Sequence, residues 1–105
     1  MQNPSSAEVR LERLLALIER LQAETEGFFE QPEQEQLWYN RGYANGMIGA
    51  MDALGYAALL SGRAQADAPD LLAGCELLSW GRAYLHGQEV GERETYEVLS
   101  PKRAD

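Results

Sequence analysis

The chain has 105 residues, one cysteine and a formal net charge of −8, with a sequence pI near 4.6. This length predicts a single domain, 1–105, and the negative charge disfavours nonspecific binding to nucleic acid or to anionic membranes. The lone Cys75 excludes an internal disulfide, which is typical of a reducing compartment. Because the first residues lack the basic and apolar regions of a signal peptide, we expect a cytoplasmic protein.

Leucine and isoleucine recur at helical spacing near the N-terminus and predict an amphipathic helix over about 7–25. The stripe consists of Leu11, Leu14, Leu15, Ile18 and Leu21. It is expected to pack onto the rest of the domain or to pair with a second copy of the chain, although two to three heptads are too few to define a coiled coil. Residues 1–5 and 100–105 are expected to form flexible tails.

The connection that follows is the most biased segment of the chain in charge. Residues 22–40 contain five glutamates and no basic residue: Glu24, Glu26, Glu30, Glu33 and Glu35. One interpretation is a solvated turn, and the other is a docking surface for a basic partner. Pro32 suits the first turn of the next helix.

A long central helix is predicted over about 33–61, and the other segments are expected to pack around it. Small residues occupy one narrow face at steps of four, three and four residues: Gly42, Gly46, Gly49 and Ala53. Glycine in a helix interior costs about 1 kcal/mol relative to alanine, so we expect this seam to allow another backbone to approach closely. The alternative is that the glycines divide the segment into two short helices.

Arg41, Asn45 and Asp52 form a polar line on this otherwise apolar helix. Buried polar groups need partners, so these side chains either satisfy one another and neighbouring groups or bind a small anion or carboxylate. Arg82 and His86, farther along the chain, complete the candidate polar cluster. If Arg41 and Arg82 faced one groove, they could clamp an acidic group.

A third helix is predicted over about 68–88, with Asp67 as its cap, and a short fourth helix near 92–99. Residues 39–46 and 80–87 share a pattern of aromatic, any residue, arginine, small, tyrosine, any residue, Asn or His, and glycine. This similarity is explained either by duplication or by parallel selection for close packing of two helices.

The segment Arg41-Gly42-Tyr43-x-x-Gly46-x-x-Gly49 resembles the RGYxxGxxG segment of bacterial ribosome modulation factors. The resemblance covers about a tenth of the chain. Those proteins are basic, as binding to ribosomal RNA requires, whereas this chain is acidic. Their function is therefore not carried over to this protein.

These patterns predict an all-α fold, a compact bundle of three main helices with a short fourth. No catalytic, metal-binding or cofactor-binding set is evident, since His86 is the only histidine and no phosphate-binding glycine loop follows a strand. We therefore expect a non-catalytic interaction or regulatory module that binds a protein with a basic surface, without a cofactor. The alternatives are a phage-type inhibitor that mimics nucleic acid, and a small-molecule-binding domain that uses the polar line. Homodimerisation through the first helix or the glycine seam is a further prediction.

Overall fold

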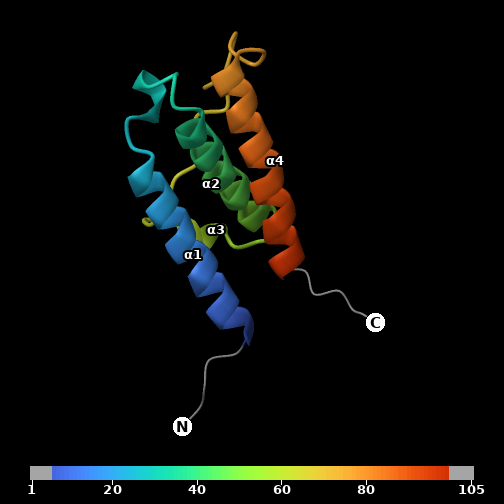
Figure 1. The fold of residues 1–105 in the computed structure, drawn as a ribbon. Helices are drawn as coiled ribbons and strands as arrows, with labels where there is room; N and C mark the ends of the chain where they lie inside the picture. Colours follow the sequence, from blue (N-terminus) through green and yellow to red (C-terminus); the bar gives the residue numbers. More distant parts are fainter. Residues whose placement is uncertain (1–5, 100–105) are drawn as a thin grey trace.

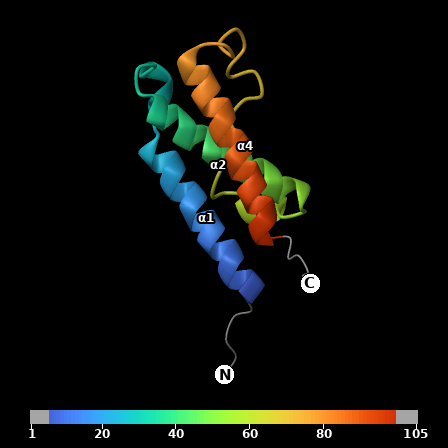
Figure 2. The same ribbon diagram turned by 45° about the vertical axis from the view of Figure 1, so that its right-hand side comes forward.

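The computed structural model describes residues 6–99, so the tails predicted at 1–5 and 100–105 lie outside the described part of the chain. Its helices are α1 (Ser6–Glu24), the 3-10 helix η1 (Phe28–Glu30), α2 (Glu35–Ala53), α3 (Ala57–Leu60) and α4 (Ser79–Leu99). Figures 1 and 2 show α1, α2 and α4 as a three-helix bundle with α3 at one end. The all-α prediction of three main helices and a short fourth is confirmed, and residues 6–99 contain no strand.

The apolar stripe of α1 packs onto α2, as its spacing predicts. Leu15 and Ile18 are buried against Met47, Ile48 and Met51 of α2. The helix observed at Ser6–Glu24 is within one residue of the predicted 7–25. None of the helices among the described residues is long and apolar enough to cross a membrane.

Parallel packing of α2 against α4 is the most extensive helix–helix contact in the molecule (Figure 1). Gly42 and Gly46 of α2 lie directly against the backbone of α4, where an added Cβ would overlap the carbonyl oxygens of Tyr84 and Gln88. Gly87 and Gly91 of α4 lie in the same way against the backbone of α2. The close backbone approach predicted for the seam is therefore confirmed at Gly42 and Gly46.

The other half of the predicted seam has a different environment. Gly49 and Ala53 are exposed, and a Cβ built on Gly49 would meet nothing within 4 Å. Because α4 of the same chain already covers Gly42 and Gly46, the prediction that the glycine seam is a homodimer surface is wrong at these two positions.

The predicted helix 33–61 is too long, and the break falls at Gly55. α2 ends at Ala53, Gly55 adopts a left-handed backbone with φ of +96°, and the short α3 follows. Glycine is the residue that adopts this conformation without a steric penalty. The alternative, in which the seam glycines divide the segment, is also wrong, because α2 is continuous through Gly42, Gly46 and Gly49 and the break lies beyond them.

The predicted third helix, 68–88, begins eleven residues later than expected and extends farther. Residues 69–78 form successive turns, with Gly74 at φ +82°, and α4 starts at Ser79. The fourth helix expected at 92–99 is the second half of α4, and the short helix is α3 instead. Helical spacing of Leu71, Leu72, Cys75 and Leu78 therefore gave an incorrect start.

The repeat of 39–46 in 80–87 does not match the packing of the two helices. In sequence, the two segments are offset by 41 residues. In the structure, the contact of Gly42 with Tyr84 is mirrored by the contact of Gly87 with Tyr39. The contact of Gly46 with Gln88 is mirrored in the same way by that of Gly91 with Tyr43, so equivalent positions in the two helices are 45 residues apart. The spacing of equivalent contacts therefore differs from the spacing of the sequence repeat by about one helical turn. This difference favours selection for close packing over duplication.

The segment between α3 and α4 runs back along the bundle to the end where α4 begins (Figure 2). Arg63 holds its first part on α1, since its guanidinium donates to Glu12 at 3.0 and 3.1 Å and to Glu19 at 2.9 and 3.1 Å. Hydrogen bonds from Arg63 lower the pKa of both carboxyls. Farther along, Leu72 is buried with Phe28, Trp38 and Tyr84 in a second core cluster.

Candidate functional site

Five exposed glutamates gather where α1 ends and α2 begins, at one end of the bundle (Figure 1). We call this surface the acidic end. It consists of Glu24 on α1, Glu26 in the following turn, Glu30 on η1, Glu33 in the next turn and Glu35 on α2. They are the residues that the sequence singled out as a candidate partner-binding surface.

The turn that carries these carboxylates is held in place by aromatic packing. Gly27 reverses the chain with φ of +81°, and the buried Phe28 ring then packs edge-on against Trp38 at 4.8 Å between ring centres. The Trp38 indole N–H donates to the backbone carbonyl of Gln31 at 3.0 Å. The carboxylates therefore project from an anchored scaffold.

Most of the acidic end has no compensating charge. Glu24 lies 3.8 Å from Arg20, but both side chains are more than half exposed. Within residues 6–99, the other four glutamates make no ion pair. Phe29, which is 55% exposed, stands among them and gives the surface an apolar contact point.

Two members of the polar line predicted on the central helix, Arg41 and Asn45, are part of a closed network around Asp67. The Arg41 guanidinium donates to both Asp67 carboxylate oxygens, at 2.8 to 3.2 Å, and the Tyr84 hydroxyl donates to the same carboxylate at 2.6 Å. Asn45 accepts a hydrogen bond from the Asp67 backbone N–H at 2.9 Å and donates to Gln88 at 3.2 Å. The network fixes the 61–78 segment onto α2 and α4.

Burial makes this network stable against ionisation of its phenol. The Asp67 side chain is 9% exposed and that of Arg41 is 19% exposed. Burial, and then the hydrogen bond to the Asp67 carboxylate, raise the pKa of Tyr84 well above its usual value near 10. Arg41 also contacts the Thr25 hydroxyl and lies 5.1 Å from the centre of the Phe28 ring, so its charge and donors are satisfied internally.

Asp67 has a different role from the helix cap predicted for it, because no helix starts at 68 and its carboxylate binds Arg41 and Tyr84. The partnership with Arg41 spans 26 residues of sequence and joins a loop to a helix. No local spacing rule connects such positions, so the sequence predicted that Arg41 needs a partner and left the partner unidentified.

The remaining members of the candidate polar cluster do not join this network. Asp52 is exposed near the far end of α2, and Arg82 and His86 are exposed on α4. Arg41 and Arg82 therefore do not face one groove, and the predicted arginine clamp is not formed.

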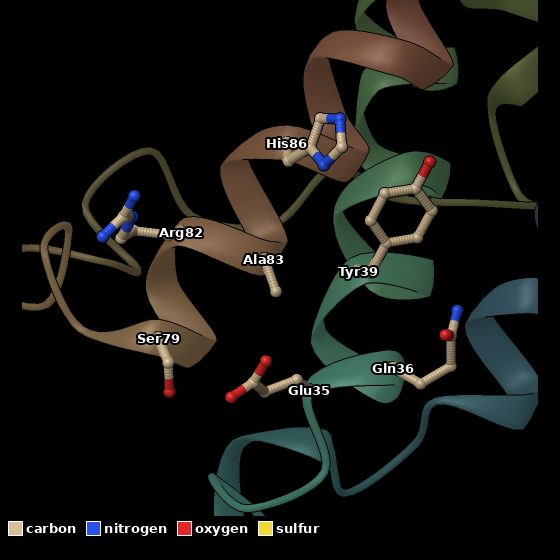
Figure 3. A pocket seen from close by; sticks show the side chains of 7 residues that line it. All are labelled: Glu35, Gln36, Tyr39, Ser79, Arg82, Ala83 and His86. Atoms are coloured by element: carbon tan, nitrogen blue, oxygen red, sulfur yellow. The ribbon is translucent and has the colours of Figure 1, made fainter.

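Arg82 and His86 instead line an open hollow of about 580 Å³ between the first turns of α2 and α4. Figure 3 shows the Glu35 carboxylate and the Ser79 hydroxyl at one end of it and His86 beside the Tyr39 ring at the other. The two rings meet edge-on at 5.4 Å between centres, and Arg82 is directed away from them (Figure 3). Among the described residues, no group of histidine, cysteine and carboxylate side chains is arranged to hold a metal ion.

Comparison of the chain with protein-family models, with curated proteins and with solved structures finds no match. Any function must therefore be inferred from the residues and their geometry. Of the surfaces predicted from sequence, the acidic end is the one that combines exposure, uncompensated charge and a fixed backbone.

Proposed function

We propose that the protein is a non-catalytic interaction or regulatory module that binds a basic protein surface through the acidic end. The observation that carries this proposal is the set of four exposed glutamates without an ion pair among the described residues: Glu26, Glu30, Glu33 and Glu35. Grouped carboxylates of one sign attract and orient a basic partner. The exposed Phe29 ring would add apolar contact area at the centre of the interface.

A pull-down followed by binding with the purified partner tests the proposal. The wild-type chain is immobilised, host lysate is applied at low salt, and proteins released by high salt are identified by mass spectrometry. A basic protein released by salt is expected, because exposed charge pairs are screened within about 10 Å at 0.1 M salt. The captured protein is then purified for direct affinity measurements.

The decisive comparison uses two charge-reversal variants. The first changes Glu26, Glu30, Glu33 and Glu35 to lysine. The control changes four carboxylates that are exposed elsewhere to lysine: Asp52, Glu89, Glu92 and Glu97. Both variants alter the net charge equally, so an effect of total charge alone would weaken binding in both. If the first variant loses binding and the control does not, the result supports the acidic end as the binding surface. If wild type and the first variant bind equally well, the result contradicts this assignment.

An inhibitor that mimics nucleic acid is a narrower form of the same proposal. Duplex DNA presents one charge per 1.7 Å or so along its axis, so a mimic needs an extended row of carboxylates. The acidic end is carried by the short connection between α1 and α2 at one end of the bundle, which favours the general form (Figure 1). If DNA or RNA competes with the chain for the captured partner, the narrower form gains support.

A further inference from the structure

A second hollow, of about 480 Å³, lies between the 67–76 turns and α4. Its apolar lining includes Leu72, which is buried, and Leu85, which is 39% exposed. Its polar lining residues include Asp67, Asp70 and Glu76. We call this hollow the loop groove.

The loop groove is negative and contains no basic residue in its lining. The charge of Asp67 is compensated by Arg41, whereas Asp70 and Glu76 are exposed and make no ion pair among residues 6–99. Glu76 accepts a hydrogen bond from the backbone N–H of Gly74 at 3.1 Å, which holds its carboxylate close to the turn. The hollow near His86 differs, because Arg82 and Glu35 in its lining are opposite in charge.

The network around Asp67 fixes the wall of the loop groove. Asp67 is bonded to Arg41, Tyr84 and Asn45, and Gln88 on the opposite wall accepts from the Asn45 amide. Because these contacts exist before any partner binds, little conformational entropy is lost when the groove is filled.

We propose that the loop groove receives a lysine or arginine side chain of the basic protein partner, an inference that rests on the proposed function. The alkyl stem would lie along Leu72 and Leu85, and the cationic head would meet Asp70 and Glu76 at the rim. Long basic side chains bury their stems on apolar surface while their charged ends remain at the edge. The groove thereby adds a specific anchor to the general attraction of the acidic end.

Model peptides test the groove without the unidentified partner. The ¹⁵N-labelled full chain is titrated with acetyl-Gly-Lys-Gly-amide and acetyl-Gly-Arg-Gly-amide, and acetyl-Gly-norleucine-Gly-amide serves as the uncharged match for the lysine stem. We expect saturable amide shifts in 67–76 and at Leu85 and Gln88 with the two basic peptides. Equal shifts with norleucine would overturn the proposal, and so would the absence of shifts in this region.

Two variants locate the binding charge. Asp70→Asn with Glu76→Gln should weaken binding of the basic peptides about fivefold, a loss expected for two exposed charge contacts. Asp52→Asn with Glu97→Gln, which are exposed outside both the acidic end and the loop groove, should leave their affinity unchanged. If the variant with Asp70→Asn and Glu76→Gln binds the basic peptides as tightly as wild type, the groove assignment is wrong. This holds even if the acidic end still binds the captured partner.

A free diamine tests whether the groove binds a basic side chain of a protein or a small free amine. Cadaverine carries an ammonium on a stem like that of lysine but has no peptide backbone. Binding of cadaverine without binding of either basic peptide would overturn the side-chain assignment in favour of a small amine. Failure of the acidic-end charge reversal to affect the captured partner would instead refute the proposed function and leave the peptide result unaffected.

Discussion

Gly46 and Gly49 lie three residues apart on α2, yet their surroundings are opposite. A Cβ on Gly46 would overlap the backbone of Gln88, whereas one on Gly49 would meet nothing within 4 Å. The two glycines are indistinguishable by local spacing, because both continue the small-residue face of the predicted helix. The contact with α4 separates a packing glycine from a merely permissive one.

Alanine substitution at these two positions should therefore change stability in opposite directions. Gly46→Ala forces the α2 and α4 backbones apart, and we expect it to lower the free energy of unfolding by about 1–3 kcal/mol or more. Gly49→Ala replaces an exposed glycine inside a helix, and we expect a gain of about 0.5–1 kcal/mol. Urea unfolding followed by circular dichroism measures both. Equal effects of the two changes would contradict the backbone contact.

Arg41 shows how far residue chemistry alone can predict a site. An arginine on an apolar helix face must be paired, and the structure pairs it with Asp67, Thr25 and the Phe28 ring. The need for a partner follows from desolvation. The identity of the partner depends on the path of the 61–78 segment, which has no regular period that a sequence pattern could reveal.

At the level of elements, prediction succeeded where one apolar stripe faces one neighbour. The α1 stripe has that form, and its bounds were predicted within one residue. The prediction extends α2 too far because apolar residues continue beyond Gly55, although the backbone is left-handed at that residue. α4 was cut short because Gly87 and Gly91 are weak helix formers, and close contact with the α2 backbone offsets their cost.

The attachment of the 61–78 segment to α1 should depend on pH through Arg63. Its hydrogen bonds lower the pKa of Glu12 and Glu19 below the usual value near 4.5. A carboxyl with a lowered pKa in the folded state adds stability above its unfolded pKa, and this stability is lost as the pH falls through the folded value. Arg63→Gln should therefore be less stable than wild type at neutral pH, and the difference should shrink as the pH falls below the usual carboxyl pKa near 4.5.

The control for this comparison is Arg20→Gln, which removes an exposed pair at 3.8 Å within α1. Exposed pairs of this kind contribute little, so its stability should follow that of wild type at every pH. Urea midpoints measured at several pH values give the comparison. A difference between wild type and Arg63→Gln that persists unchanged in acid would show that Arg63 acts through packing and not through the carboxylates.

At the level of the whole molecule, two phenol–carboxylate pairs tie α4 to the rest of the bundle. Tyr84 donates to Asp67 of the connecting segment, and Tyr43 of α2 donates to Glu94. Burial first, and then the hydrogen bond to Glu94, raise the pKa of Tyr43 to about 12. The pKa of Tyr84 is raised in the same direction for the same reasons. Both pairs thus require a neutral phenol facing a charged carboxylate.

Stability should therefore fall in alkali, and Tyr84 should account for part of the fall. A phenol whose pKa is raised on folding contributes stability that is fully present below about pH 10 and is lost as the pH rises toward the folded value. Tyr84→Phe removes a hydrogen bond to a charged group, so it should cost about 1.5–3 kcal/mol at neutral pH. As the pH rises above about 10, its deficit relative to wild type should shrink.

The sequence has a single lysine and a single cysteine, but its five tyrosines titrate in the same range, so the effect of Tyr84 is obtained by comparing variants. Tyr96→Phe is the matched control, because the Tyr96 hydroxyl makes no hydrogen bond to another described residue. Its unfolding midpoint should follow that of wild type across the whole range. Thermal unfolding by circular dichroism, with tyrosinate absorbance recorded in parallel, measures both effects. A constant deficit for Tyr84→Phe from neutral pH to pH 12 would mean that the ionisation of Tyr84 is not coupled to folding.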